Sequence, residues 1–147
     1  MNIYQANDKR KYLRLLLLAD EQENMIEKYL DKGIMYVLDD DGVKAEIVVL
    51  GEGNGVLKIK NLAVEPEFRR QGYAKKLVEF ICGRYKQKYD TLLVGTGDSP
   101  LTVPFYESCG FKRSHAVKNF FTDNYERPIY ECGVRLVDMV YFVKNLE

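Results

Sequence analysis

The feature that most constrains the fold is an extended apolar segment joined by a short basic loop to an amphipathic helix. Residues 56–66, VLKIKNLAVEP, have strand character, and Pro66 ends the strand because proline cannot donate to a β-ladder. The stretch that begins at Gln71 predicts a helix, since its apolar residues recur at i, i+3, i+4, i+7 and i+11. These residues are Ala74, Leu77, Val78, Ile81 and Tyr85. A strand followed directly by a helix favours a mixed α/β fold.

The loop between them, RRQGYA at residues 69–74, is an unusual start for a helix. Its two arginines lie where an acidic residue or a Ser/Asp cap is normally preferred. Backbone N–H groups at such a junction can cradle a phosphate, and Gly72 lets the backbone approach it closely. The alternative is a solvated helix start with basic surface residues. The loop lacks Gly-x-Gly-x-x-Gly and Gly-Lys-Ser/Thr, which disfavours a dinucleotide Rossmann site and a P-loop NTPase.

Composition excludes several classes of protein and site. A chain of 147 residues, 46% of them apolar, is expected to form one globular domain over residues 1–147. Its formal net charge is zero, so no whole-molecule field attracts nucleic acid or an anionic membrane. Three cysteines without a paired motif and a single histidine argue against a disulfide framework and a metal site. No targeting segment is visible, and a reducing, cytoplasmic setting is the simplest interpretation.

The rest of the chain predicts elements in the order ααβββαβαββ. The first helix is expected over residues 9–19 and the second directly after it, with Asp20 as its cap. Within residues 56–64 the side chains on each face of the expected strand change between apolar and polar halfway along. This change predicts a β-bulge near Lys60-Asn61. Hairpin turns are expected at Asp39–Gly42 and Gly51–Gly55, strands at 91–97, 111–121 and 135–146, and a short helix at 101–110.

Two motifs resemble those of the GNAT family of N-acetyltransferases. Residues 62–77, LAVEPEFRRQGYAKKL, are similar to the family's acetyl-CoA-binding segment, Arg/Gln-x-x-Gly-x-Gly/Ala behind a strand that ends in Val-x-Pro. Residues 104–113, PFYESCGFKR, resemble its second signature, Tyr-x-x-x-Gly-Phe. The resemblance covers most of residues 1–115. It implies an acyl-CoA N-acyltransferase fold, in which a central, mostly antiparallel, twisted sheet is flanked by helices and splayed at the cofactor-binding strands.

The resemblance also implies which residues contact acetyl-CoA, the expected cosubstrate. Backbone groups of Leu62 and Val64, with Ala63 between them, would pair with the pantetheine arm as if it were another strand. The backbone N–H groups from Arg70 to Lys75 would hold the pyrophosphate. The expected cofactor-binding residues of the loop are therefore Arg69, Arg70, Gln71, Gly72, Tyr73, Ala74 and Lys75.

The second motif departs from the family pattern. Where relatives often carry Asn seven residues before the tyrosine, this chain has Ser99, which we expect to contact the cofactor in its place. Where they often carry Ala four residues before it, there is Thr102. Pro100 and Pro104 alter the same stretch. The cofactor contacts of this segment are therefore less well defined than those of the first loop.

Three residues are candidates for catalysis. The resemblance implies that Tyr106 reaches the thioester sulfur, where it would mainly hydrogen-bond the departing sulfur. A tyrosine buried in the core is the alternative. Glu46, on a central strand and acting through water, and His115, just past the second motif, are both candidates for the general base. Cys109 is better explained as a buried thiol than as a nucleophile.

These observations predict an acetyl-CoA-dependent N-acetyltransferase that acts on a primary amine of a small molecule. A protein N-terminal or lysine acetyltransferase and a non-catalytic acyl-CoA sensor remain alternatives. A nucleic-acid-binding module is disfavoured by the zero net charge. Half of the aromatic residues fall in residues 105–147, which is typical of an acceptor wall, a homodimer surface or ordinary core packing.

Overall fold

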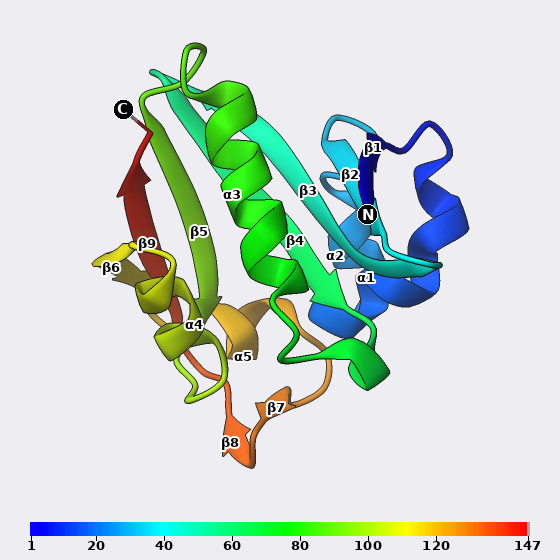
Figure 1. Cartoon of the computed structure of the whole chain (residues 1–147). Helices are drawn as coiled ribbons and strands as arrows, with labels where there is room; N and C mark the ends of the chain where they lie inside the picture. Colours follow the sequence, from blue (N-terminus) through cyan, green and yellow to red (C-terminus); the bar gives the residue numbers. More distant parts are fainter. Residues whose placement is uncertain (147) are drawn as a thin grey trace.

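The computed structural model describes residues 1–146, and its main feature is a seven-stranded sheet in the order β1-β2-β3-β4-β5-β9-β6 (Figure 1). The strands are β1 Asn2–Gln5, β2 Ile34–Asp39, β3 Val43–Gly53, β4 Val56–Val64, β5 Thr91–Gly97, β6 Lys112–Val117 and β9 Met139–Asn145. A separate hairpin is formed by β7 Tyr130–Glu131 and β8 Val134–Arg135. The helices are α1 Leu13–Ala19, α2 Glu23–Glu27, α3 Tyr73–Tyr85, α4 Thr102–Ser108 and α5 Phe120–Asn124, with 3₁₀ turns at Lys9–Tyr12 and Pro66–Phe68.

The sheet is antiparallel except where β4 meets β5. These two strands pair in parallel only from Val56 opposite Thr91 to Ile59 opposite Val94. Beyond that point β4 stays paired with β3, and β5 stays paired with β9 as far as Gly97. The two strands therefore diverge toward their C-terminal ends, as Figure 1 shows. The predicted mostly antiparallel sheet, splayed at these strands, is confirmed.

A β-bulge marks the place where the two strands part. Val48 of β3 lies opposite Asn61, whereas the next residue, Val49, lies opposite Ile59, so Lys60 is the extra residue on β4. The predicted bulge near Lys60-Asn61 is confirmed. A bulge bends its strand and increases the local twist, which turns the rest of β4 away from β5.

Helices cover both faces of the sheet, and each encloses a hydrophobic core. On one face α3 buries Leu77 and Ile81 against Ile47 and Leu92, and all four are fully buried. On the other face α1 and α2 bury a smaller cluster that includes Leu16, Ile26, Leu30 and Val48. Figure 1 shows α3 in front of the sheet and the N-terminal helices beside β3 and β4. The stripe of apolar residues that predicted α3 therefore faces the core, except that Ala74 is only half-buried.

The N-terminal segment differs from its expected form. Its first helix begins as a 3₁₀ turn and becomes α-helical only at Leu13. The expectation that Asp20 caps the second helix was wrong, because α2 starts at Glu23 and its N-cap residue is Gln22. Asp20 instead is extended, and its carboxylate accepts a hydrogen bond from Tyr125. Strand β1 was not expected at all.

The segment after Phe111 is also more broken than its residue types predicted. Strand β6 ends at Val117, and Asn119 takes a left-handed conformation with φ 56° before α5 begins. Phe121 of α5 is then buried, as a helical residue instead of a strand residue. The chain returns through the β7–β8 hairpin to β9, the last strand.

Candidate active site

The diverging strands leave one edge of β4 without a partner at Leu62, Ala63 and Val64. These residues pair with β3 on one side, and no strand among residues 1–146 pairs with them on the side of β5. Ala63 is buried, and Leu62 and Val64 are half-buried. The unpaired N–H and C=O groups of an edge strand are able to pair with an extended ligand. The structure thus places the three predicted strand residues on an open edge.

The loop that follows β4 presents backbone N–H groups to a common point. Arg70 and Gly72 have positive φ values of 64° and 85°, and such a turn aims successive N–H groups to one side as an anion-binding nest. The first amide of this stretch with a backbone acceptor is that of Lys76, which donates to the Gly72 carbonyl at 3.0 Å. No side chain caps α3, and a Cβ built on Gly72 meets nothing within 4 Å. The start of the helix is therefore open for an anion.

The side chains of the loop fall into two groups. Those of Arg69, Arg70, Gln71 and Lys75 are exposed, and within residues 1–146 none of the three cations forms a salt bridge. Tyr73 points inward instead, and its hydroxyl donates to Asp40 Oδ2 at 2.8 Å. This bond ties the start of α3 to the β2–β3 turn. Any contact of Tyr73 with an anion at the loop is therefore made by its backbone.

Tyr106 lies across the split from the open edge of β4. Its ring packs edge-to-face against Phe105 and Phe111 and stacks on Phe142 of β9 with centroids 6.3 Å apart. Leu62 and Val64 pack against the same hydrophobic cluster. The hydroxyl forms no hydrogen bond with any of residues 1–146. Burial, followed by the neighbouring Cys109 and Glu131, raises the pKa of Tyr106 above its ordinary value of 10.0, so the phenol stays protonated.

Ser99 is buried at the start of α4, where its hydroxyl is already engaged. Its Oγ donates to the Glu131 carboxylate and accepts from the backbone N–H groups of Leu101 and Thr102 at 3.3 and 3.4 Å. Ser99 therefore holds the turn that precedes α4, whose N-cap residue is Leu101, and links the β7–β8 hairpin to it. Glu131 was missed by the sequence analysis, because an acidic residue in a polar loop carries no pattern that predicts a contact with α4.

Glu46 of β3 is fully buried, and neither of its carboxylate oxygens has a hydrogen-bond partner among residues 1–146. It lies opposite Ala63 in the strand pairing, one strand from the open edge. Asn61 is buried nearby on β4; its amide donates to the Leu16 carbonyl and the Tyr29 hydroxyl, while its Oδ1 is unpaired. Burial raises the pKa of Glu46 well above its usual 4.5. The carboxyl is thus a strong proton acceptor once ionised.

His115 lies apart from these groups on the edge strand β6. It is exposed, and its ring stacks on Tyr141 of β9 with centroids 4.7 Å apart and an interplanar angle of 9°. Ser114 Oγ lies 3.0 Å from His115 Nδ1. The structure therefore brings the loop, the open edge and Tyr106 together around one split, with Glu46 one strand away, and places His115 beside Tyr141.

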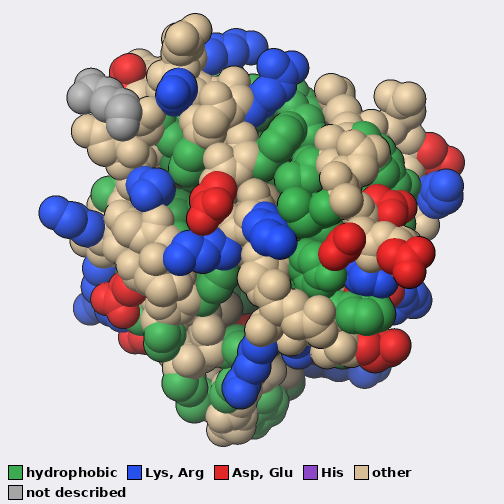
Figure 2. Space-filling model, in the orientation of Figure 1, with side chains coloured by type: hydrophobic (Ala, Val, Ile, Leu, Met, Phe, Trp, Pro, Cys, Tyr) green, Lys and Arg blue, Asp and Glu red, His purple; other side chains and the backbone are tan. Residues whose placement is uncertain are grey.

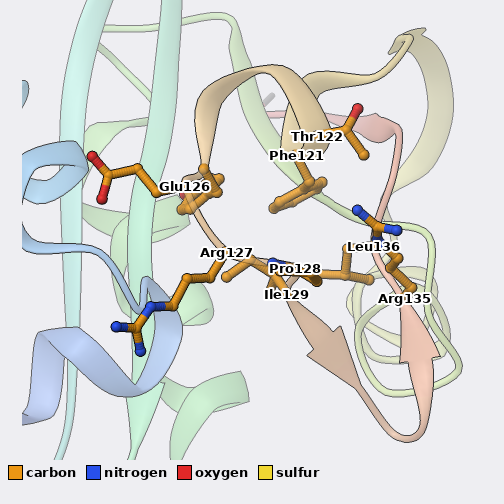
Figure 3. A pocket seen from close by; sticks show the side chains of 9 residues that line it. Phe121, Thr122, Glu126, Arg127, Pro128, Ile129, Arg135 and Leu136 are labelled. Carbon is orange, nitrogen blue, oxygen red and sulfur yellow. The ribbon is translucent and has the colours of Figure 1, made fainter.

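Two cavities lie near these elements. One, of about 110 Å³, is enclosed by α5 and the β7–β8 hairpin, and Figure 3 shows Phe121, Ile129 and Leu136 lining it. The other, of about 240 Å³, lies between α3 and the end of α4, where Lys75 of the loop, Cys109 and Lys144 line it. On the face that carries α3, Lys, Arg, Asp and Glu side chains are interspersed, so no large field of one sign forms there (Figure 2).

The cysteines, the possible metal ligands and the lengths of the helices also bear on function. Cys82, Cys109 and Cys132 are all free thiols. Within residues 1–146, no group of three or more His, Cys, Asp or Glu residues is placed to hold a metal ion. None of the helices in that range has the length and apolar character needed to cross a bilayer.

Comparison with known proteins gives the site its context. The family described as "Acetyltransferase (GNAT) domain" matches residues 31–113. A curated relative, the uncharacterised N-acetyltransferase YvbK of Bacillus subtilis strain 168, is 33% identical over 135 residues, which cover 90% of this chain and 87% of the relative.

Solved structures agree with that match. A GNAT family acetyltransferase from Elizabethkingia anophelis with acetyl-CoA bound has a TM-score of 0.91 and 31% identity, over 98% of this chain and 97% of the other. A Bacillus subtilis acetyltransferase in complex with CoA has a TM-score of 0.88 and 29% identity, over 98% and 97% of the two chains. The similarity therefore extends over nearly the whole chain, including the C-terminal segment that lies outside the family match.

Proposed function

The chain belongs to the GNAT family of acetyltransferases, and from that premise we propose that it acetylates a primary amine of a small molecule by direct attack on acetyl-CoA. The observation that carries this proposal is the split between β4 and β5, because it joins an open strand edge to an uncapped helix start and faces a protonated tyrosine. One sheet that joins the first strand, β1, to the last strand, β9, supports a single domain over residues 1–147.

We place the cosubstrate along the open edge. The pyrophosphate would be held by the backbone N–H groups from Arg70 to Lys75, with Arg69 and Arg70 adding charge. The pantetheine arm would pair with the backbone of Leu62 and Val64 and so extend the sheet. Because the phosphate end lies beyond the C-terminal end of β4, the thioester end would point back toward the bulge at Lys60. Tyr106 and Ser99 would approach it from the side of β5.

The chemistry needs a neutral amine and a thiol able to leave. A lysine-like amine with a pKa of about 10.4 is neutral in roughly one molecule in two thousand near pH 7. A cysteine-like thiol has a pKa of about 8.5, whereas the ordinary pKa of tyrosine is about 10, so full proton transfer from tyrosine to such a thiolate costs about 2 kcal/mol. Burial of Tyr106 raises its pKa further and increases that cost. Its role is therefore to donate a hydrogen bond to the departing sulfur.

The acceptor's ammonium must lose a proton before the neutral amine can attack, and that proton needs an acceptor. Glu46 fits this role by its raised pKa and by its two unpaired oxygens, which one bridging water next to Asn61 would connect toward the split. His115 has the right ordinary pKa for the role, but it is exposed at the sheet edge beside Tyr141. We therefore favour Glu46 as the proton acceptor.

Two measurements on the full chain test the proposal. Calorimetry with acetyl-CoA is expected to show binding that the Arg69→Ala/Arg70→Ala variant weakens without a loss of fold. A thiol-release assay over a panel of small amines and lysine-containing peptides is expected to show turnover on the small amines. Binding without turnover on any amine would favour an acyl-CoA sensor, whereas turnover on peptides alone would favour a protein acetyltransferase.

A further inference from the structure

Two lysines of β4 converge on the face of the sheet that α1 and α2 partly cover. Lys58 Nζ donates to the Tyr141 hydroxyl at 3.3 Å and lies 4.9 Å from the centroid of that ring. Lys60 Nζ lies 5.5 Å from the centroid of the Tyr29 ring. Burial, followed by the adjacent charge of Lys58, lowers the pKa of Lys60. The two ammonium groups are therefore neighbours that are partly removed from water.

Their positive charge has little compensation from the protein. The nearest carboxylate to Lys58 is that of the exposed Glu52, whose Oε1 lies 3.8 Å from Lys58 Nζ, too far for a hydrogen bond. Within the described chain no carboxylate oxygen lies within 4.0 Å of Lys60 Nζ. The charges of Glu52 and Asp20 act on Lys60 from a longer distance and oppose the lowering of its pKa, and the Asp20 carboxylate also accepts the hydroxyl of Tyr125. Two partly desolvated like charges repel one another, and an anion bound between them would remove that cost.

The lysine pair lies next to the reacting end of the proposed cosubstrate. Lys60 is the bulged residue, directly after Ile59, the last residue of β4 that pairs with β5. The open edge at Leu62–Val64 follows at once. The thioester is placed at the N-terminal end of this edge, toward the bulge. A molecule whose amine attacks it there would hold its other groups within reach of the lysines. Tyr29 and Tyr141 are buried and flank the pair, with the Lys60 and Lys58 ammonium groups lying over their rings.

We propose that Lys58 and Lys60 bind a carboxylate of the acceptor, so that the acceptors are amino acids or related amines that carry a carboxylate. This inference rests on the proposed transfer to a small amine and names its substrate class. Two ammonium donors satisfy a carboxylate through charge-assisted hydrogen bonds, and they leave the amine at the other end of the molecule free to react.

Matched acceptor pairs test the proposal by kinetics. Each amino acid is compared with the amine that lacks its carboxylate, such as phenylalanine with phenethylamine and β-alanine with ethylamine. In the wild type, kcat/KM for the carboxylated member is expected to be higher by about 10- to 100-fold. Lys58→Met and Lys60→Met keep the aliphatic stems and are expected to abolish this preference, while the Kd of acetyl-CoA stays within about twofold.

Lys88→Met is the matched control, because Lys88 also lies over a tyrosine ring, that of Tyr89 at 5.8 Å, but far along the chain in an exposed turn. It is expected to keep the wild-type preference. Equal or better turnover of the carboxylate-free amines by the wild type would overturn the proposal. So would a preference that survives in both the Lys58→Met and Lys60→Met variants.

A titration that does not depend on turnover separates this proposal from the transferase proposal. Propionate is added to the protein while the side-chain NMR signals of Lys58 and Lys60 are followed, with inorganic phosphate in a parallel series. A propionate-dependent shift that is lost in Lys60→Met supports the site, and its absence overturns the site even if amines are acetylated. A stronger response to phosphate than to propionate would overturn the assignment to a carboxylate. If no amine is acetylated, the transferase proposal fails, and the titration still decides the site.

Discussion

At the scale of one residue, the burial of Tyr106 determines whether its hydroxyl can donate or accept a proton. The apolar surroundings that raise its pKa also hold its ring between Phe105, Phe111 and Phe142. A phenol that stays protonated donates a hydrogen bond but does not act as a base near neutral pH. The ring contacts belong to the core and also fix the position of the hydroxyl, as the proposed role requires. The two interpretations of this tyrosine from its motif are therefore compatible.

We predict that Tyr106→Phe lowers kcat by about 10- to 100-fold, because the change removes only the hydrogen bond to the departing sulfur. Because the pKa of Tyr106 is raised, its hydroxyl remains a hydrogen-bond donor up to and beyond pH 10. Ionisation of Tyr106 therefore causes no loss of wild-type activity below that pH. The thiol-release rate from pH 6 to 10 checks both statements. A rate within twofold of the wild type would remove this role from Tyr106.

Glu46 is the residue whose burial has the clearest dependence on pH. Its folded pKa is raised, so its contribution to stability is full below its ordinary pKa of 4.5 and is lost as the pH rises through the folded value. Glutamine does not ionise, so Glu46→Gln removes this loss of stability at higher pH. We predict that the free energy of unfolding shifts in favour of the variant between pH 4.5 and pH 7.5, as measured by urea denaturation.

The same variant tests the proton acceptor. If Glu46 accepts the proton of the amine, Glu46→Gln is expected to lower kcat/KM by about 10²- to 10⁴-fold near pH 7.5. His115→Gln, an exposed change, is the comparison and is expected to stay within a few-fold of the wild type. The opposite pattern, with His115→Gln the slower enzyme, would transfer the role to His115.

At the scale of elements, the strand–loop–helix unit was predictable because its signals are local. Pro66 ends β4, Gly72 permits positive φ, and the helical spacing of apolar residues orients α3. The bulge at Lys60 was predictable for the same reason, since the break in the alternation of polar and apolar side chains lies in adjacent residues. The cap of α2 was not, because Asp20 forms its contact with a residue 105 positions away. The local sequence around Asp20 carries no information about such a distant hydrogen-bond partner.

Gly72 carries the prediction at this scale. Gly72→Ala places a Cβ in a left-handed conformation with φ 85°, which costs about 1–2 kcal/mol of stability. The same Cβ enters the open space where we place the pyrophosphate, so the Kd of acetyl-CoA is expected to rise by about tenfold or more. Thermal denaturation and calorimetry measure the two effects.

Gly83→Ala is the matched control within the same helix. Gly83 lies in α3 without a positive φ, and a Cβ there meets nothing within 4 Å. This change is expected to stabilise the protein by about 0.5–1 kcal/mol and to leave acetyl-CoA binding unchanged. Equal affinities for acetyl-CoA in the two variants would contradict the placement of the pyrophosphate at the loop.

At the scale of the whole molecule, the C-terminal segment is fastened to the N-terminal helices. The Tyr125 hydroxyl donates to Asp20 Oδ1 at 2.8 Å, and the Glu126 amide donates to Gln22 Oε1 at 3.2 Å. Burial raises the pKa of Asp20, and the Tyr125 hydrogen bond opposes that shift. The contact therefore joins the α1–α2 connection to the segment that precedes the β7–β8 hairpin.

We predict that Tyr125→Phe lowers the free energy of unfolding by about 1–3 kcal/mol, because it removes the side-chain donor of the partly buried Asp20 carboxylate. Tyr130→Phe is the control: Tyr130 is 60% exposed, and its loss of a hydroxyl is expected to change stability by less than about 0.5 kcal/mol. Urea denaturation at neutral pH measures both. An unfolding free energy for Tyr125→Phe that equals that of Tyr130→Phe would contradict this account of the contact.

The sequence by itself determined the β4–loop–α3 unit, the bulge, the second motif and, through their resemblance to the GNAT family, the splayed sheet and the cosubstrate. Each depends on neighbouring residues or on a motif, so no distant contact was needed to infer it. Only the tertiary structure decided that Glu131 engages Ser99, that Asp20 meets Tyr125, and that Lys58 and Lys60 converge between Tyr29 and Tyr141. Those contacts join residues far apart in the chain, and their energies arise from burial and charge that exist only once the sheet has formed.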